Sequence, residues 1–573
     1  MRTTDTNSAG GAGTLIEAVW PEGADDDSTA IVYMETGREP VTLTRREFLE
    51  TARRYAHALR ELGIRPGDLV LVAHDDTLSV AYCFWGLLLA GAIPSIYTTP
   101  NERLFPEVYM ANIAALIRNV DARALLTLDD LAEKFAPTMD CPMIGFARIQ
   151  AALPERAESP FPTHAARPEE IAYVQTSSGT TGNQRCVPTT HRMILGQIES
   201  FARRMEVSER DVIVNWMPLY HDGGLIFGTV LPLYCRVPVV LISPLDWVRH
   251  PAILFKAIHE HGATLCNMPN FAFNHCARRI RERDVEGISL AGMRAFVNGS
   301  ERVYPTSFER FLERFASIGA APDRLGVAYG LAENTLMVTH TILGRPIVYD
   351  AVDREKLEGE QIAVRAGPGT EDVAVHVSCG PPLDGVEVRI LDEEDRDRPP
   401  RHVGQIAVRS NCLFSGYYLR PEMNASLFRG DWFLTGDMGY LAEGEVYVVG
   451  RLKDLIINGG KNLYPADLEE IAGATPGVRP GRAVVFGVPD ETEGTELIAV
   501  VVETDVADPE QRAEIDRSIR RAITQHASVA VSFVDVINER WIIKTSSGKT
   551  SRTANRRKWL AAKKSNPGAP LVG

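Results

Sequence analysis

Short apolar, strand-like runs alternate with helical stretches over most of this chain. Examples are Asp68–Val72 (DLVLV), Arg123–Leu128 (RALLTL), Val239–Ile242 (VVLI) and Arg294–Val297 (RAFV). Buried strands separated by helices are typical of α/β folds, in which helices cover a mostly parallel sheet. The alternation therefore predicts layered α/β structure. The chain shows no fixed-period repeat of the kind that indicates a solenoid or a propeller.

The length predicts more than one domain, because 573 residues exceed the size at which a single hydrophobic core keeps growing. We expect a large N-terminal domain over residues 1–452, made of layered α/β subdomains and a β unit. The β unit is indicated by the strand-like runs Val386–Leu391 and Gly404–Val408. A small, mobile α+β domain is expected over residues 453–573.

Composition narrows the range of partners. The chain has 61 Lys and Arg against 75 Asp and Glu, a net charge of −14, which argues against nucleic acid or an anionic membrane as the main partner. Met1–Gly13 lacks the pattern of a signal peptide. Ser79–Tyr97 is the most membrane-like segment, but its glycines and proline favour a buried helix that turns into a strand. The 8 cysteines show no C-x-x-C spacing, which indicates reduced thiols in a cytoplasmic protein.

A run rich in glycine and hydroxyl side chains, Thr176–Val187 (TSSGTTGNQRCV), follows the strand-like Ile171–Val174. Such a run can point several backbone N–H groups at one anion, and its glycines let the backbone approach a phosphate closely. No Gly-Lys-Ser/Thr ends it, so it is not a Walker A loop. Taken alone, the run is also compatible with a flexible surface turn.

The segment Ser178–Gly182 (SGTTG) resembles the phosphate loop of the adenylate-forming superfamily, which contains acyl-CoA synthetases, peptide-synthetase adenylation domains and firefly luciferase. That family usually continues with x-Pro-Lys-Gly-Val, whereas this chain has Arg185, a planar cation, near the lysine position. The resemblance implies binding of ATP phosphates by Thr176, Ser177, Ser178, Gly179, Thr180, Thr181, Gly182 and Arg185.

Two further segments resemble the family's nucleoside and metal sites. Tyr329–Glu333 (YGLAE) is similar to its Tyr-Gly-x-Thr-Glu segment, which implies that Tyr329 and Gly330 lie at the adenine and that Glu333 binds Mg²⁺. Thr435–Asp437 (TGD) resembles its ribose site, where a carboxylate accepts hydrogen bonds from both hydroxyls.

The resemblance continues into the C-terminal part of the chain. Gly450–Asp454 (GRLKD) resembles the family's inter-domain junction, with Arg451 on the ribose side and Lys453 at the hinge. Lys544–Lys549 (KTSSGK) resembles its mobile loop. The implied role of Lys549 is catalytic: its ammonium lies between the substrate carboxylate and the α-phosphate when the small domain closes.

Three segments resemble motifs of the superfamily's fatty acyl-AMP ligase branch: Trp216–Leu225 (WMPLYHDGGL), Cys266–Phe273 (CNMPNFAF) and Asn298–Val303 (NGSERV). Aromatic walls suit an aliphatic or aromatic acid, although spacing alone does not separate pocket lining from core packing. Gly223 stands where the branch usually has Met, and the missing side chain predicts a wider or reshaped acyl site. Expected pocket residues are His221, Asp222, Gly223, Asn270, Phe271 and Phe273, and expected nucleotide-site residues are Gly299, Ser300 and Glu301.

The charged, irregular residues 343–376 fall where that branch carries a characteristic insertion. By the resemblance, the insertion restrains the domain motion that would let coenzyme A attack, and the acyl group passes to an acyl carrier protein. A long surface loop is the alternative, because added loop length costs little stability. The apolar residues expected to dock part of the insertion on the body are Ile347, Val348, Ile362, Val364, Val373 and Val375.

These features predict an enzyme of lipid or secondary metabolism that uses ATP and Mg²⁺ to convert a carboxylic acid, fatty or related, into an acyl-AMP. Transfer to an acyl carrier protein is the expected second step. An acyl-CoA synthetase, an amino-acid-activating enzyme anchored by Asp222 and a non-catalytic nucleotide-binding relative remain as alternatives. Retention of Glu333, Asp437 and Lys549 argues against the last of these.

Overall fold

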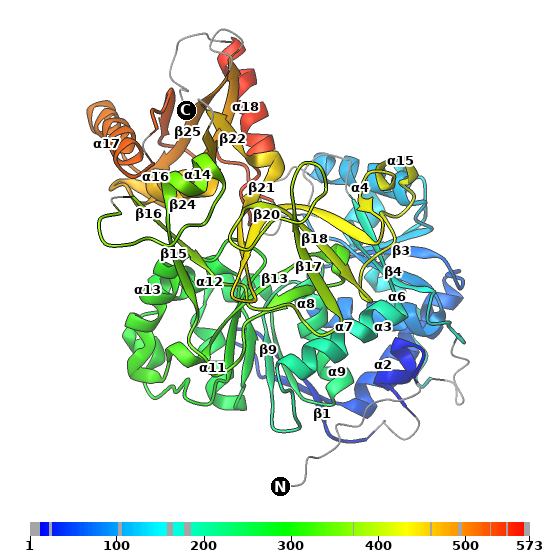
Figure 1. Ribbon diagram of the computed structural model, residues 1–573. Helices are drawn as coiled ribbons and strands as arrows, with labels where there is room; N and C mark the ends of the chain where they lie inside the picture. The colour runs from blue at the N-terminus through cyan, green and yellow to red at the C-terminus, as the bar shows by residue number, and fades with distance from the viewer. Residues whose placement is uncertain are drawn as a thin grey trace.

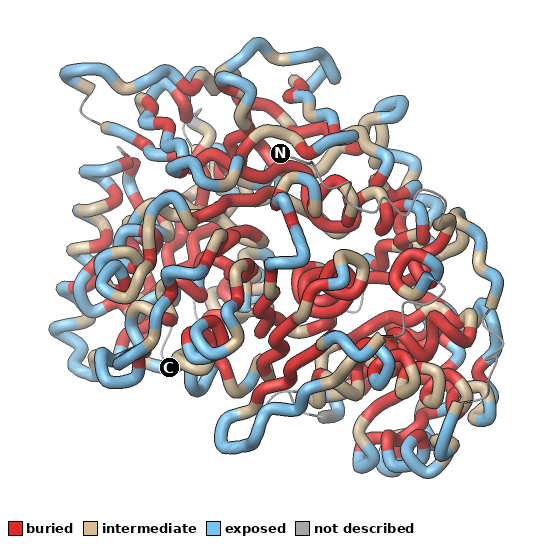
Figure 2. The backbone as a smooth tube through the Cα atoms, turned by 90° about the horizontal axis from the view of Figure 1, so that it is seen from below, coloured by how far each residue is buried: buried red, intermediate tan, exposed pale blue. Residues whose placement is uncertain are grey.

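The computed structural model in Figure 1 describes residues 12–21, 26–100, 106–157, 164–176, 185–370, 372–458, 461–490, 495–527, 529–545 and 548–565. A large domain, coloured blue to yellow, carries a smaller C-terminal domain, coloured orange to red. The backbone is most deeply buried in the interiors of the sheets and of the helices packed on them, while exposed loops surround them (Figure 2).

The largest sheet has eight strands in the order β14-β13-β12-β11-β9-β10-β1-β2. Its inner strands run parallel, and β14 and β2 add antiparallel edges. Strands β9 to β12 are buried along their whole length, as expected when helices cover both faces. The strands are β1 (Thr29–Met34), β2 (Val41–Thr44), β9 (Ile213–Asn215), β10 (Val239–Ile242), β11 (Leu265–Asn267), β12 (Ala295–Asn298), β13 (Leu325–Gly330) and β14 (Met337–His340). The associated helices are α1 (Leu15–Val19), α7 (His191–Arg204), α8 (Asp222–Leu225), the π-helix η2 (Ile226–Val230), α9 (Leu231–Cys235), α10 (Pro244–Arg249), α11 (Ala252–His261), α12 (Asn270–Arg279) and α13 (Pro305–Phe315).

A second, wholly parallel sheet has the order β4-β3-β5-β6. Helix α3 is apolar around most of its circumference and almost fully buried, so the expected buried helix after Ser79 is confirmed. No helix in the described part of the chain is long and apolar enough to cross a membrane. The elements are β3 (Leu69–Ala73), β4 (Ile93–Ile96), β5 (Ala124–Thr127), β6 (Met143–Gly145), α2 (Arg45–Glu61), α3 (Thr77–Ala90), α4 (Pro106–Val120), α5 (Asp129–Phe135) and α6 (Phe146–Ala152).

The predicted β unit is a five-stranded antiparallel sheet, and a separate hairpin flanks the predicted phosphate loop. The strands expected from VEVRIL and GQIAV are confirmed as β17 and β18. The sheet comprises β17 (Val386–Leu391), β18 (Gly404–Ser410), β19 (Phe428–Arg429), β20 (Trp432–Ala442) and β21 (Glu445–Arg451), with α15 (Pro421–Asn424) beside it; the hairpin is β7 (Ile171–Thr176) and β8 (Cys186–Thr190).

The segment predicted to be an irregular insertion has regular structure. Strand β15 (Tyr349–Asp353), helix α14 (Arg354–Glu360) and strand β16 (Val373–Val377) form an antiparallel hairpin with a helix in its connection. Val352 and Leu357 pack with Tyr440 of β20, so part of the segment docks on the β unit. Of the six apolar residues expected to dock, Ile347 is buried, whereas Val348, Val364, Val373 and Val375 are exposed.

The C-terminal domain has its own sheet, β24-β25-β26, with helices packed on both faces and its own hydrophobic clusters. The predicted boundary at residue 452 falls in the short 3₁₀ helix η7 (Leu452–Asp454). The elements are β22 (Ile456–Asn458), β23 (Lys461–Leu463), α16 (Pro465–Ala474), β24 (Val478–Asp490), β25 (Thr495–Thr504), α17 (Pro509–Ala527), β26 (Phe533–Ile537) and α18 (Arg552–Ser565).

Candidate active site

The expected site segments follow the carboxyl ends of neighbouring parallel strands. His221 comes after β9, Asn270 after β11, Glu301 after β12 and Glu333 after β13. In open α/β sheets, ligands bind beyond this edge. The topology therefore brings together four sequence segments that are far apart in the chain.

At one end of the site, Tyr329 and Arg451 converge on Asp437. The Tyr329 hydroxyl donates to Asp437 Oδ2 at 2.7 Å, and Arg451 Nε donates to Asp437 Oδ1 at 3.1 Å. Burial and the adjacent carboxylate raise the pKa of Tyr329. Gly330 has no room for a side chain, because a Cβ there would collide with the Leu336 carbonyl oxygen. Three residues expected at the nucleoside thus form one hydrogen-bonded group.

Glu333 is linked to the expected phosphate side through a tyrosine that the sequence did not indicate. The Tyr417 hydroxyl donates to Glu333 Oε1 at 2.5 Å and accepts from Arg185 Nη1 at 3.2 Å. The Arg185 guanidinium also lies 5.1 Å from the centre of the Tyr417 ring. Burial and Glu333 raise the pKa of Tyr417. Of the expected phosphate-loop residues, Thr176 is the last residue of β7. The others lie outside the described residues: Ser177, Ser178, Gly179, Thr180, Thr181 and Gly182.

The lysine loop makes a tight turn. The Thr545 N–H donates to the Lys549 carbonyl oxygen at 2.7 Å, and the Lys549 N–H donates to Thr545 Oγ1 at 3.2 Å. Gly548 has a φ of 83°, a left-handed conformation that glycine adopts without strain. These two bonds fix the backbone of Lys549 relative to Thr545.

Lys549 of the C-terminal domain lies within electrostatic reach of large-domain carboxylates. Burial lowers the pKa of its ammonium, and Asp222 and Glu301 offset this only in part. Burial in turn raises the pKa of Glu301, whose Oε1 accepts a hydrogen bond from the Phe271 N–H at 2.6 Å. The charge of a cation in one domain therefore acts on carboxylates of the other.

Asp222 already has partners. His221 Nδ1 lies 2.8 Å from Asp222 Oδ1, and the Gly223 N–H donates to the same oxygen at 2.7 Å. Burial raises the pKa of Asp222, but His221 and Lys549 outweigh burial and leave that pKa below its ordinary value. Both contacts use Oδ1, and Lys549 adds a further positive charge that acts on this carboxylate.

Two pocket predictions are corrected by the structure. Phe273 is fully buried, with its ring centre 5.1 Å from those of Phe308 and Phe311, so it belongs to the core. The extra room predicted beside Gly223 is absent, since a Cβ there would lie 2.8 Å from Asn267 Nδ2. Phe271, by contrast, is 38% exposed.

Asn270 holds the loop after β12. Its Oδ1 accepts from Asn298 Nδ2 and from the Tyr304 N–H, both at 3.2 Å. This loop contains Gly299, packed close to the Ala328 carbonyl, and Ser300, whose φ is 71°. Asn270 therefore positions Glu301 rather than lining an open pocket.

The expected hinge residue Lys453 lies exposed in η7.

Comparison with known proteins places this arrangement in a family. A model of the AMP-binding enzyme family matches residues 20–418, and a model of the AMP-binding enzyme C-terminal domain matches residues 467–549. The chain therefore belongs to the AMP-binding enzyme family, within the adenylate-forming superfamily and near its fatty acyl-AMP ligases.

Individual relatives are similar over nearly their whole length. The long-chain-fatty-acid–AMP ligase FadD26 of Mycobacterium tuberculosis is 30% identical over 92% of this chain and 94% of its own. The medium-chain-fatty-acid–[acyl-carrier-protein] ligase JamA of Moorena producens is 29% identical (93% and 92%), and a Caulobacter vibrioides protein provisionally named an acyl-CoA synthetase is 30% identical (93% and 91%). A solved structure from work on fatty acyl-adenylate ligases of E. coli and L. pneumophila has a TM-score of 0.87 and 27% identity, covering 97% of this chain and 98% of that one.

Proposed function

We propose that this chain activates a fatty or related carboxylic acid with ATP to form an acyl-AMP, and then transfers the acyl group to an acyl carrier protein. The observation that carries the proposal is the electrostatic interaction of Lys549, in the C-terminal domain, with Asp222 and Glu301 of the large domain. Relatives named for fatty-acid–AMP ligation and for ligation to acyl carrier protein support the same two steps.

In the first step a carboxylate oxygen of the acid attacks the α-phosphorus of ATP, and the bond to pyrophosphate breaks. We assign Asp437 to the ribose hydroxyls and Arg185 to the departing phosphates. Lys549 offsets the repulsion between the carboxylate and the α-phosphate. Such a reaction depends on positioning and on charge stabilisation more than on covalent help from the protein.

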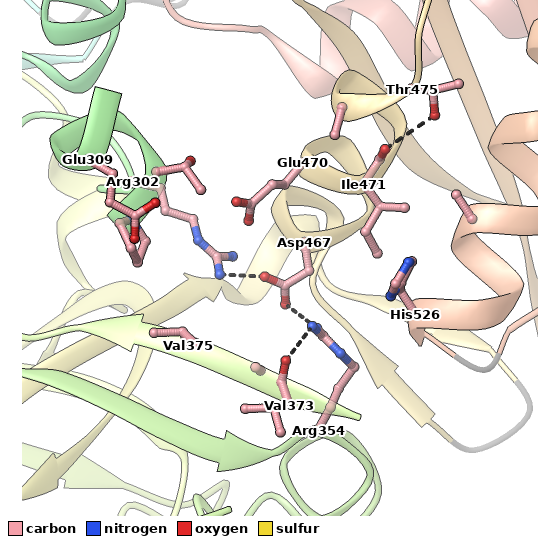
Figure 3. Close-up of a pocket in the computed structure, with 15 residues that line it drawn as sticks. Arg302, Glu309, Arg354, Val373, Val375, Asp467, Glu470, Ile471, Thr475 and His526 are labelled. Atoms are coloured by element: carbon pink, nitrogen blue, oxygen red, sulfur yellow. Dashed lines mark hydrogen bonds and ion pairs between the residues drawn. The ribbon is translucent and has the colours of Figure 1, made fainter. Parts of the chain in front are cut away.

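The inserted segment supports a carrier protein rather than coenzyme A as acceptor. Arg354 of α14 and Arg302 of the large domain both approach Asp467 of helix α16 in the C-terminal domain (Figure 3). Arg354 Nη1 lies 3.7 Å from Asp467 Oδ2, and Arg354 Nε donates to Asp372 at 2.9 Å. An ion-pair cluster across the domains resists the rotation that would expose the adenylate to a free thiol.

ATP–pyrophosphate exchange with fatty, aryl and amino acids tests the first step, and acceptor assays test the second. We expect exchange with fatty acids, followed by acylation of a phosphopantetheinylated carrier protein. Abundant acyl-CoA in a matched reaction with coenzyme A would favour the second candidate, an acyl-CoA synthetase, which the name of the Caulobacter relative suggests. Absence of exchange with every acid would contradict the proposal.

We also propose that Glu333 supplies the protein's carboxylate to Mg²⁺, which would neutralise phosphate charge. Within the described residues no three His, Cys, Asp or Glu side chains gather as a metal site. In this proposal, oxygens of water and ATP are further ligands of the ion. Glu333→Gln is expected to raise the Mg²⁺ concentration for half-maximal exchange by about tenfold, since one anionic ligand is lost. Magnesium titrations of the parent and of Glu387→Gln, an exposed control paired with Arg409, would detect this, and identical titration curves would contradict the assignment.

A cytoplasmic location fits these steps. The eight cysteines form no disulfide, and all but Cys235 are buried. Reduced thiols of this kind are typical of reducing compartments.

A further inference from the structure

Two buried asparagines lie side by side at the ends of neighbouring strands. Val214 of β9 pairs with Cys266 of β11, so Asn215 and Asn267 follow together at the carboxyl ends of these strands. Their exposed fractions are only 1% and 2%. Ordinary core positions at the ends of buried parallel strands are apolar, and amides there require hydrogen-bond partners.

Each amide packs closely against a glycine of the helical segment formed by α8 and η2. A Cβ on Gly223 would lie 2.8 Å from Asn267 Nδ2, and a Cβ on Gly228 would lie 2.8 Å from Asn215 Nδ2. Gly228 belongs to the π-helix η2, a type of helix that is frequent at functional sites. The missing side chain at Gly223 therefore makes room for an amide and not for a longer acyl chain.

The described residues leave the oxygen of each amide without a hydrogen bond. The Oδ1 atoms of Asn215 and Asn267 are buried and have no hydrogen-bond partner among the described residues. Asn215 Nδ2 donates to the Met217 carbonyl oxygen at 3.1 Å, whereas the structure gives the Asn267 side chain no hydrogen bond within its described part. Unpaired buried acceptors of this kind point to a ligand or an ordered water.

Gly223 links the amide pair to the proposed reacting centre. A Cβ on Gly223 would lie 2.8 Å from Asn267 Nδ2, and Gly223 directly follows Asp222, the carboxylate on which the charge of Lys549 acts. A group bound by Asn267 would thus sit on the first carbons beyond the substrate carboxylate, if Lys549 acts on that carboxylate as proposed above.

We propose that Asn215 and Asn267 recognise a hydroxyl group on carbon 2 or carbon 3 of the acid; this inference rests on the proposed function. A hydroxyl donates to an unpaired Oδ1 and accepts from Asn267 Nδ2, so it satisfies both kinds of atom. A keto group only accepts and leaves the Oδ1 atoms unpaired. An ammonium also donates to an Oδ1, but it cannot accept from Asn267 Nδ2, and the positive charge of Lys549 already acts on the neighbouring carboxylate Asp222.

The test compares decanoic, 2-hydroxydecanoic, 3-hydroxydecanoic and 10-hydroxydecanoic acids in ATP–pyrophosphate exchange by the parent enzyme. We expect kcat/KM for the 2- or 3-hydroxy acid to exceed that for decanoic acid by on the order of 100-fold, because an acid without the hydroxyl leaves buried amides unpaired. The 10-hydroxy acid should behave like decanoic acid or worse. Equal values for all four acids, as expected if water satisfies the amides, would overturn the proposal.

Variants test whether the Asn267 side chain causes the preference for a hydroxy acid. Asn267→Leu should abolish the preference, so that kcat/KM for the hydroxy acid and for decanoic acid become equal. Asn274→Leu is the matched control, since Asn274 lies on α12 and donates to Ser307 Oγ at 2.7 Å, away from the pair. If Asn267→Leu does not fold, Gly223→Ala provides a second displacement of the same amide. A preference that survives both changes would overturn the proposal, whereas exchange with no acid at all would instead contradict the proposed function.

Discussion

Replacing Lys549 with alanine is expected to slow acyl-adenylate formation by about 10²–10³-fold, the usual cost of losing one preorganised charge at a transition state. The structure gives the physical reason: Lys549 is a cation of the C-terminal domain whose charge interacts with Asp222 and Glu301 of the large domain. Single-turnover formation of adenylate is the measurement. Lys563→Ala is the control, because Lys563 pairs with Asp535 inside the C-terminal domain. Equal rates for the parent and Lys549→Ala would remove the catalytic role.

The pH profile supplies a readout that a merely structural lysine would not move. Burial leaves the pKa of Lys549 below its ordinary value of about 10.4, so the cation is present below this pKa and is lost as pH rises through it. The kcat/KM profile of the parent should therefore fall on the alkaline side below that value. Lys549→Arg keeps a charge at every accessible pH, so its remaining activity should lack this limb.

Much of the fold followed from the sequence because buried parallel strands appear as apolar runs between helices. VVLI became β10, and VEVRIL became β17. Residues 343–376 escaped prediction for a physical reason. Their hairpin is held by long-range polar contacts: Asp350 accepts from the Tyr440 hydroxyl at 2.8 Å and from Arg401 Nη2 at 3.0 Å. Local periodicity contains no signal for such partners.

In the site, too, local motifs were predictable from the sequence, whereas long-range partners were not. Tyr329, Asp437 and Arg451 were predicted from separate motifs, and the structure joins them by hydrogen bonds. Phe271 and Phe273 could not be separated by spacing, because residues two apart on a helix face different directions and only the fold decides which direction is core. Tyr417 was missed since its partner Glu333 is 84 positions away in the chain.

Substituting Asp467 should have the largest effect on how the two domains are held together. Asp467 is 5% exposed and is approached by Arg302 and Arg354, which lie on separate segments of the large domain (Figure 3). Burial would raise the pKa of Asp467, but the two arginines outweigh burial and keep that pKa below its ordinary value. The cluster borders a cavity of about 590 Å³ lined also by Glu470 and His526.

Asp467→Ala leaves two largely buried guanidinium groups without their shared carboxylate, a change that costs about 3–5 kcal/mol. We expect weaker docking of the C-terminal domain, seen as faster hydrogen exchange in α16, and a higher ratio of acyl-CoA to carrier-protein product. Asp516→Ala is the control, because Asp516 forms a partly exposed pair with Arg520 within α17, worth at most about 1 kcal/mol. If Asp467→Ala and Asp516→Ala gave the same exchange in α16 and the same product ratio, the cluster would not restrain the domains, and the preference for a carrier protein would need another physical cause.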